Sequence, residues 1–217
     1  MKILNLYACL GGNRYKWDEV TNIEVTAVEW DNELAKLYQE RFPNDKVIVA
    51  DAHQYLLDHY KEFDFIWSSP PCPTHSQTNW FLNSQNVIRY PDMHLYQEII
   101  FLNSFFKGKF VVENVVPYYE PLIAAKKRGR HLYWTNFNLP NVLSNRIAPS
   151  MKAHSDRTAN NWKLFLKFHN IDLKKYKGKQ SKPKIARNLV DYEAGKTILE
   201  TACGIIRKQN FSQITMF

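Results

Sequence analysis

The residue of this chain best suited to covalent chemistry is a cysteine framed by prolines. Cys72 stands in the run Pro70-Pro71-Cys72-Pro73, where the proline rings stiffen the backbone and exclude a helix. An apolar run, residues 63–67, precedes it, so we expect the thiol to be held rigidly at the end of a buried strand. Free cysteines are usually small buried hydrophobes, and we interpret Cys9 and Cys203 in that way. The rigid setting of Cys72 instead favours a nucleophile.

Two further motifs carry charged groups that could act beside such a nucleophile. Glu113-Asn114 follows the apolar run 110–112, and a carboxyl group emerging from a buried strand has either a raised pKa or a hydrogen-bonding task. Arg128 and Arg130 flank Gly129 just before another apolar run. Alternation along the chain predicts that one of these arginines points inward. A basic run on the surface is the alternative.

Residues at the ends of the first three predicted strands fit a cofactor that contains adenosine. Gly11-Gly12 would let the backbone approach a ligand, although the pattern lacks G-x-G-x-x-G. Glu29 closes the second strand, where nucleoside-binding folds place the acid for the ribose hydroxyls, and Trp30 could stack on a purine. Asp51 closes the third strand and could accept from the adenine amino group. Each could also be a solvated loop residue, but together they favour the cofactor.

The elements that must position these residues alternate between strand and helix. One helix is expected over 33–41 with Asn32 as its cap, and another over 92–107. The predicted strands are residues 3–8, 23–28, 47–49, 63–67, 110–112 and 131–137. This order predicts an α/β fold with a doubly wound, mostly parallel sheet and helices on both faces. Ligands bind at the carboxyl ends of such strands, where the glycine pair, the three acids and Cys72 all lie.

Beyond residue 137 the pattern changes. Residues 138–150 are predicted as loop, 155–168 as a helix, and 174–184 as a basic segment broken by glycine and proline. A closing helix is expected over 191–207, with its inner face formed by Ile198, Leu199, Ala202 and Ile205.

The positive charge of the chain is concentrated in this second half. The 217 residues include 29 Lys and Arg against 21 Asp and Glu, a net charge of +8. Residues 141–187 hold 12 of the basic residues and 2 of the acidic ones. A local excess of this size favours a polyanion over a small neutral substrate, and nucleic acid is the first candidate. A solubilising surface is the other interpretation.

Composition excludes several classes of protein. Hydrophobic residues make up 45% and charged residues 23%, as in ordinary globular proteins. No apolar run approaches the roughly 20 residues that span a bilayer, so no membrane segment is expected. Leu6-Tyr7-Ala8-Cys9 lies too close to Met1 to end a signal peptide. The three cysteines cannot all pair and follow no zinc spacing, which predicts a reduced, cytoplasmic chain without a metal.

In combination, these motifs resemble the DNA (cytosine-5) methyltransferases that use S-adenosylmethionine. Ser69-Pro70-Pro71-Cys72 resembles the catalytic segment, Glu113-Asn114-Val115 the second catalytic signature, and Arg128-Gly129-Arg130 the paired-arginine motif. Residues 5–12 resemble the cofactor loop D-L-F-A-G-x-G-G, with Asn5 and Cys9 in place of its Asp and first Gly.

Three shorter segments extend the likeness. Glu29-Trp30-Asp31 and Asp51-Ala52 resemble the family's adenosine-binding positions, and Arg187-Asn188-Leu189-Val190 resembles its C-terminal segment G-N-x-V. The likeness covers roughly residues 3–137 and 185–200.

This resemblance implies a fold, a cofactor and a reaction. The fold would be the Rossmann-like class I methyltransferase fold, and the cofactor S-adenosyl-L-methionine, released as S-adenosyl-L-homocysteine, with no metal. Cys72 would add to carbon 6 of cytosine, and Glu113 would hydrogen-bond ring nitrogen 3 and the exocyclic amine. Arg130, supported by Arg128, would hold the carbonyl oxygen of the base. The implied cofactor-binding residues are Tyr7, Ala8, Leu10, Gly11, Gly12, Glu29, Trp30, Asp51, Ala52, Pro70, Asn188 and Leu189.

The implied partner is duplex DNA with the target cytosine flipped out. Family members usually insert a target-recognition domain after the arginine motif, and here only about 138–184 is available. We therefore expect a catalytic domain over 1–137, a minimal basic recognition region over 138–184, and a C-terminal segment over 185–217 that packs back; a separate specificity subunit could supply recognition. The residues expected to bind nucleic acid are Ser76, Trp80, Lys174, Lys175, Lys177, Lys179, Lys182 and Lys184.

The small size indicates a restriction-modification or phage enzyme, in the cytoplasm of a bacterial or phage-infected cell.

Three other functions stay open on the sequence. The same chemistry could act on cytosine in RNA such as transfer RNA, or on a free pyrimidine nucleotide, although the basic segment argues against the latter. A degenerate nucleic-acid-binding subunit would explain the altered cofactor loop, but Cys72, Glu113 and Arg130 argue against it.

Overall fold

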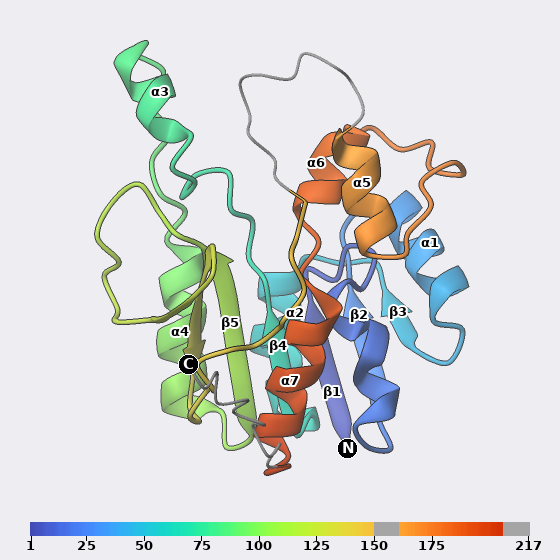
Figure 1. Cartoon of the computed structure of the whole chain (residues 1–217). Coiled ribbons are helices and arrows are strands. Elements are labelled where there is room, and N and C mark those ends of the chain that lie inside the picture. Colours follow the sequence, from blue (N-terminus) through green and yellow to red (C-terminus); the bar gives the residue numbers. More distant parts are fainter. Residues whose placement is uncertain (150–160, 206–217) are drawn as a thin grey trace, which may run out of the picture.

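Seven strands form one sheet in the order β3-β2-β1-β4-β5-β7-β6 in the computed structural model, which describes residues 1–149 and 161–205 (Figure 1). Their bounds are Lys2–Leu6 (β1), Glu24–Val28 (β2), Lys46–Ile48 (β3), Phe65–Ser68 (β4), Lys109–Val115 (β5), Lys126–Arg128 (β6) and His131–Thr135 (β7). The first five strands run parallel, and β7 lies antiparallel to both of its neighbours. The predicted α/β fold with a doubly wound, mostly parallel sheet is confirmed.

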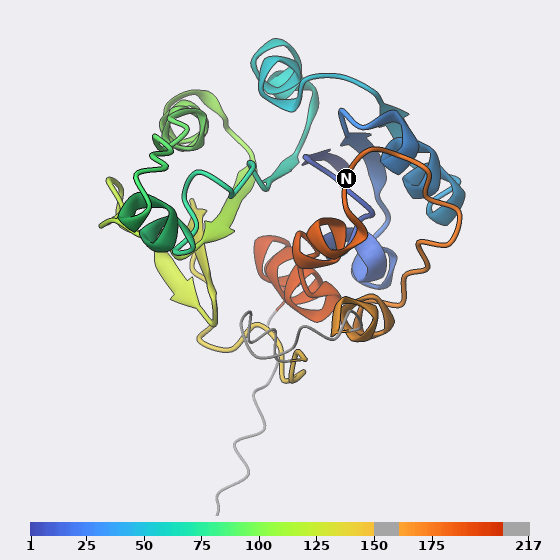
Figure 2. The same ribbon diagram turned by 90° about the horizontal axis from the view of Figure 1, so that it is seen from above.

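Helices cover both faces of this sheet. The view from above shows α2 and α4 on one face and η1 and α7 on the other (Figure 2). Strand residues alternate between these two layers, since Ile3 packs with Trp17 of η1 whereas Leu4 packs with Leu56 of α2. Both faces of the strands are therefore buried, which explains the nearly continuous apolar runs in the sequence.

The helices are short, and none in the described ranges is long and apolar enough to cross a membrane. Their bounds are Asn13–Glu19 (η1, a 3-10 helix), Asn32–Arg41 (α1), Ala52–His59 (α2), Tyr60–Glu62 (η2, a 3-10 turn), Asn79–Ser84 (α3), His94–Phe105 (α4), Asn161–Phe168 (α5), Lys182–Arg187 (α6) and Tyr192–Ala202 (α7). Helix α3 projects away from the sheet, while α5 and α6 gather over the carboxyl ends of the strands (Figure 1).

Three local expectations are wrong. The strand expected over 110–112 continues to Val115, because Glu113 and Asn114 lie within the β5–β7 pairing instead of following the strand. The cap of α1 is Asp31 and not Asn32, since the Asp31 carboxylate accepts two backbone N–H groups of the first turn. The short strand β6 was not expected at all; it forms because β7 offers it an antiparallel edge.

The second half of the chain packs against the first. Phe165 of α5 and the buried ring of Tyr176 share one hydrophobic cluster with Leu10 and Leu34. This cluster includes residues from both sides of the predicted boundary at residue 137. The division into a catalytic domain, a recognition region and a C-terminal segment stays a prediction. The expected helix 155–168 corresponds to α5, with 155–160 outside the described residues. Ile205 follows the end of α7 and is exposed, so its expected place on the inner helix face is wrong, and 206–207 lie outside the described residues.

Replacing Gly195 with alanine should destabilise the fold. A Cβ at this position of α7 would lie 2.1 Å from the carbonyl oxygen of Asn13, and the fully buried Trp17 holds η1 against α7 by donating to the Gly195 carbonyl at 3.2 Å. We expect the G195A variant to lose about 1–3 kcal/mol of unfolding free energy in a urea titration.

The C203A variant is the control, because it changes an exposed residue at the end of the same helix. Its stability should stay within about 0.5 kcal/mol of the wild type. Equal stability of the G195A variant and the wild type would contradict the close packing of α7 on η1.

Candidate active site

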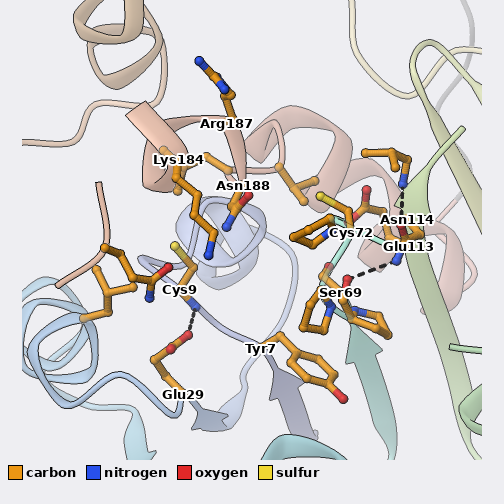
Figure 3. A pocket seen from close by; sticks show the side chains of 18 of the residues that line it. Tyr7, Cys9, Glu29, Ser69, Cys72, Glu113, Asn114, Lys184, Arg187 and Asn188 are labelled. Atoms are coloured by element: carbon orange, nitrogen blue, oxygen red, sulfur yellow. Dashed lines mark hydrogen bonds between the residues drawn. The ribbon is translucent and has the colours of Figure 1, made fainter. Parts of the chain in front are cut away.

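A pocket of about 280 Å³ lies at the carboxyl ends of β1 and β4, where the strand order reverses (Figure 3). This is the place where open α/β sheets bind ligands, because the loops that follow the two strands diverge there. Figure 3 shows Cys72 and Glu113 at one end of the pocket and Cys9 and Glu29 at the other. The lining residues are Tyr7, Cys9, Glu29, Trp30, Leu34, Ser69, Pro70, Pro71, Cys72, Pro73, Glu113, Asn114, Val115, His131, Gln180, Lys184, Arg187, Asn188, Leu189 and Val190.

The loop after β1 adopts an unusual backbone to reach this pocket. Tyr7 and Cys9 have φ angles of 56° and 48°, in the left-handed region that favours glycine. The cofactor loop D-L-F-A-G-x-G-G has glycine at the position of Cys9, and the positive φ angle explains that preference. Cys9 keeps the same turn at a cost of about 1 kcal/mol, and its backbone N–H donates to Glu29 at 2.8 Å. The thiol of Cys9 therefore lines the pocket, which its interpretation as an inert core residue did not foresee.

Glu29 presents a buried carboxylate to one end of the pocket. Its Oε2 accepts from Cys9 and its Oε1 accepts from the backbone N–H of Asp31 at 2.9 Å. Burial raises the pKa of Glu29, and the backbone N–H groups oppose that shift. Each oxygen has a second lone pair, so the carboxylate can still accept from a ligand hydroxyl. Trp30 beside it lines the pocket with 67% of its surface exposed and can present a ring face.

A buried carboxylate that sequence reasoning missed connects the two loops. Glu98 of α4 is fully buried and accepts from the hydroxyls of Tyr7 (2.6 Å) and Ser68 (2.5 Å). His53 of α2 lies 3.0 Å from the same carboxylate, and this contact raises the pKa of His53. Tyr7 follows β1 and Ser68 ends β4, so Glu98 joins the two strand ends that frame the pocket. In the sequence, the only sign of this role is that Glu98 stands within the apolar pattern of the helix expected over 92–107.

Cys72 is held in a rigid loop at the other end of the pocket. Its carbonyl oxygen accepts the backbone N–H groups of His75 and Ser76, both at 3.0 Å, and Asn114 fastens the loop by donating to the Pro70 carbonyl at 3.0 Å. Burial and the nearby Glu113 carboxylate raise the pKa of the Cys72 thiol, while Lys184 and Arg130 oppose that shift. The resting group is therefore a thiol, and its ionisation depends on the positive charges around it.

Nine of the predicted site residues line this pocket and many others do not. The nine are Tyr7, Glu29, Trp30, Pro70, Cys72, Glu113, Lys184, Asn188 and Leu189. Gly11 and Gly12 do not line it: a Cβ would lie 2.4 Å from Phe42 at Gly11 and 2.7 Å from the Val190 carbonyl at Gly12. The glycines therefore permit contact between chain segments, a different reason from the ligand approach that we expected. Ala8, Leu10, Asp51 and Ala52 also lie outside the lining, and Asp51 caps α2 by accepting from the Gln54 N–H.

The paired arginines lie outside the lining of this pocket. Arg128 donates to the carbonyl oxygens of Pro140 at 2.6 Å and Leu139 at 3.4 Å. Arg130 lies 5.5 Å from the ring centre of Phe165 and lines a second cavity of about 510 Å³. Neither arginine lines the pocket of Cys72, so their predicted contact with a ligand in that pocket has no support in this geometry.

The residues expected to bind nucleic acid are mostly exposed around the pocket. Trp80 on α3 has 63% of its surface exposed, and Ser76 forms a bridge with Pro117. Lys174 and Lys175 form exposed ion pairs with Asp172 and Glu40, respectively. Lys177 and Lys179 are exposed, Lys182 and Lys184 lie on α6, and of these lysines only Lys184 lines the pocket.

Two pocket residues from the basic segment and β7 could not be found from sequence. Gln180 donates to Asp31 at 2.9 Å, and Tyr176 donates to the same carboxylate at 3.0 Å, which ties the basic segment over the pocket. His131 lines the pocket from the start of β7. Neither residue stands in a recognisable motif.

Comparison with known proteins places the chain beside methyltransferases. The family model of the C-5 cytosine-specific DNA methylases matches residues 1–118. Among solved structures, the methyltransferase EhMeth of Entamoeba histolytica aligns over 96% of this chain and 99% of its own, with 9% identity and a TM-score of 0.53, which shows a shared fold. A mutant of DNMT2 from Spodoptera frugiperda aligns with 25% identity over 52% of this chain and 35% of its own, with a TM-score of 0.38. A search of curated proteins finds no match.

Removing the positive charge of Lys184 should make Cys72 less reactive. Lys184 lowers the pKa of the thiol, so the K184M variant should have a higher Cys72 pKa and a smaller thiolate fraction at each pH. Because Lys184 is exposed and screened by solvent, we expect alkylation by iodoacetamide at pH 8 to slow by only about twofold. Mass spectrometry of the Cys72 peptide between pH 6 and 10 measures this shift.

The matched control is K182M, on the same helix but outside the pocket lining. Its Cys72 should react at the wild-type rate. Equal slowing in both variants would indicate a general loss of surface charge and not a local effect of Lys184.

Proposed function

The chain belongs to the C-5 cytosine-specific DNA methylase family, and from that premise we propose that it transfers a methyl group from S-adenosylmethionine to carbon 5 of cytosine in DNA. Family membership makes it a methyltransferase. The observation that carries the finer proposal is that Cys72 and Glu113 share one pocket with Glu29 and Trp30. A nucleophile with a hydrogen-bonding carboxyl group thus lies beside a nucleoside-type site.

The far end of the pocket fits an adenosine-containing cofactor. The Glu29 carboxylate can accept from a ribose hydroxyl, Trp30 offers an exposed ring for adenine, and Tyr7 lies between Glu29 and the Cys72 loop (Figure 3). We assign S-adenosylmethionine to this end, with Pro70, Asn188 and Leu189 completing the wall. When bound, the cofactor supplies an electrophilic methyl group attached to a sulfonium.

Cys72 and Glu113 perform the chemistry on the base in this proposal. Carbon 5 of cytosine is a poor nucleophile, and addition of the Cys72 thiolate to carbon 6 makes it reactive toward an electrophilic methyl group. Glu113 donates to ring nitrogen 3 as negative charge develops there and accepts from the exocyclic amine. Water then takes the proton from carbon 5, the double bond between carbons 5 and 6 re-forms, and the bond from carbon 6 to sulfur breaks to release Cys72 as a thiolate. The base must leave the duplex to reach the pocket, since Glu113 is buried and Cys72 is only partly exposed.

Nucleic acid is held by the basic residues around this rim. We propose that residues 1–137 form the catalytic region and that 138–184, rich in lysine, contact phosphates, while residues from 185 onward pack back on the catalytic region. Trp80 on the projecting α3 and the nearby Ser76 would contact the strand beside the flipped base.

The C72A variant should transfer no methyl group. Labelled S-adenosylmethionine, duplex DNA and wild-type protein should give label on carbon 5 of cytosine, and the variant should lose at least about a thousandfold in rate because the addition step is absent. DNA that contains 5-fluorocytosine should form a covalent complex with the wild type, since fluorine blocks loss of the carbon 5 substituent.

RNA, duplex DNA and free cytidine nucleotides should be offered as acceptors in the same assay. Label on RNA in preference to DNA would move the substrate to RNA while keeping the reaction. Bound cofactor with no label on any acceptor would contradict the proposed function.

The E29Q variant should bind S-adenosylmethionine more weakly. It removes charge-assisted hydrogen bonds to the ribose, each worth about 1.5–3 kcal/mol, so Kd should rise about 10–100-fold in calorimetry. The D51N variant removes a predicted adenosine-binding carboxylate that the structure places outside the pocket, and asparagine preserves the helix cap. Its Kd should rise less than about twofold, and equal losses in the two variants would contradict our placement of the adenosine.

A further inference from the structure

His131 faces the pocket from the strand that pairs with the strand of Glu113. In the β5–β7 pairing, Tyr133 stands opposite Glu113 and His131 stands opposite Val115. Because residues two apart on a strand share a face, His131 is the diagonal neighbour of Glu113 on that face. Its Nε2 lies 3.6 Å from Oε1 of Glu113.

No other basic side chain is placed to hold this carboxylate. Within residues 1–149 and 161–205, His131 is the only basic side chain with a nitrogen within 4 Å of the Glu113 oxygens. Arg128 is engaged by the carbonyls of Leu139 and Pro140, and Arg130 lies over Phe165 in the second cavity. His131 is therefore the basic side chain best placed to orient the Glu113 carboxyl group.

The imidazole of His131 favours its neutral form in this setting. Its side chain is 17% exposed and that of Glu113 is 8% exposed. Burial lowers the pKa of His131 and Arg130 lowers it further, while Glu113 opposes both. The other titratable or charged groups around it are Tyr133 on β7, Cys72, Lys184 and Arg187 in the same pocket, and Arg128, Arg146, His169 and Asp191 around the second cavity, which His131 also borders.

We propose that His131 is a positioning residue that orients the carboxyl group of Glu113 toward the target base. The proposal deepens the proposed function and rests on it for the identity of the base. A hydrogen bond from Nε2–H to Oε1 of Glu113 leaves Oε2 to carry the proton that faces ring nitrogen 3. Oε1 still has a lone pair for the exocyclic amine of cytosine. The distance of 3.6 Å shortens to a hydrogen bond when the base fills the pocket, as catalytic contacts often do.

A double-mutant cycle tests this role. The H131L variant should lower the kcat of methyl transfer about 30-fold with KM within about threefold, because Glu113 still contacts the base but is misoriented. The H131Q variant keeps a donor near the position of Nε2 and should recover to within about fivefold of the wild type. In the E113Q background, H131L should cause no further loss, since the two residues act as a unit. Two results would overturn the proposal. One is that H131L lowers kcat by the same factor in the E113Q background as in the wild type, and the other is that H131L alone is as active as the wild type.

A second measurement does not depend on activity. Nuclear magnetic resonance of the labelled imidazole follows the titration of His131 in the wild type and in E113Q. Because the carboxylate stabilises the imidazolium, the pKa of His131 should fall in E113Q, by roughly half a unit or more. An unchanged titration would overturn the pairing whether or not the protein transfers methyl groups. If the pKa of His131 falls in E113Q but the wild type methylates no cytosine, the proposed function is overturned and the pairing of His131 with Glu113 is supported.

Discussion

One buried carboxylate holds the two halves of the site together. The loops after β1 and β4 diverge where the strand order reverses, and no backbone pairing joins them beyond the strand ends. Glu98 bridges this gap by accepting from Tyr7 on one side and Ser68 on the other. Loss of a buried hydrogen bond of this kind costs about 1–3 kcal/mol, and here it would also free the nucleoside end of the pocket to move against the Cys72 loop. The spacing between the two ends therefore depends on a residue that touches neither ligand.

Residues from the second half of the chain cover the pocket. Gly12 is small enough for the Leu189-Val190 backbone to pack directly on the cofactor loop. Asp31 accepts from Tyr176 and Gln180, so the carboxylate that caps α1 also fastens the basic segment. A positively charged region that could have been a free surface is thus tied to the nucleoside end of the pocket.

Electrostatics keep the proposed nucleophile inactive until a substrate arrives. Burial and Glu113 both favour the neutral thiol of Cys72, while the opposing positive charges of Lys184 and Arg130 act from α6 and from beside the second cavity. A base that hydrogen-bonds Glu113 removes one of the two effects that suppress the thiolate. In the proposed function, activation of this cysteine would depend on occupancy of the pocket.

The sequence by itself determined the fold class, the approximate positions of six of the strands and the placement of Cys72 and Glu113 at one edge of the sheet. Side chains alternate along a strand and proline stiffens the backbone, and both effects depend only on neighbouring residues. The carboxyl ends of parallel strands meet at one edge of the sheet, which follows from strand order alone. These features can therefore be derived without coordinates. It also located the acid of the second strand, Glu29, which lines the pocket. Family resemblance added the reaction, which those rules alone do not specify. The predicted residues that do not line the pocket, among them Asp51 and the paired arginines, lie just after a strand, at the end of the short strand β6 or just before β7.

Only the tertiary structure decided where those side chains point. Arg128 ends the edge strand β6 and donates to the carbonyls of residues 139 and 140, and no sequence pattern records this contact. The inclusion of His131 and Gln180 in the pocket likewise depends on which strand pairs with β5 and on which loop covers α1. Such contacts join residues 11 or more positions apart, and their side-chain directions are set by packing of the whole chain. Local propensity decides which residues form a strand, but the assembled layers decide which of them meet at a site.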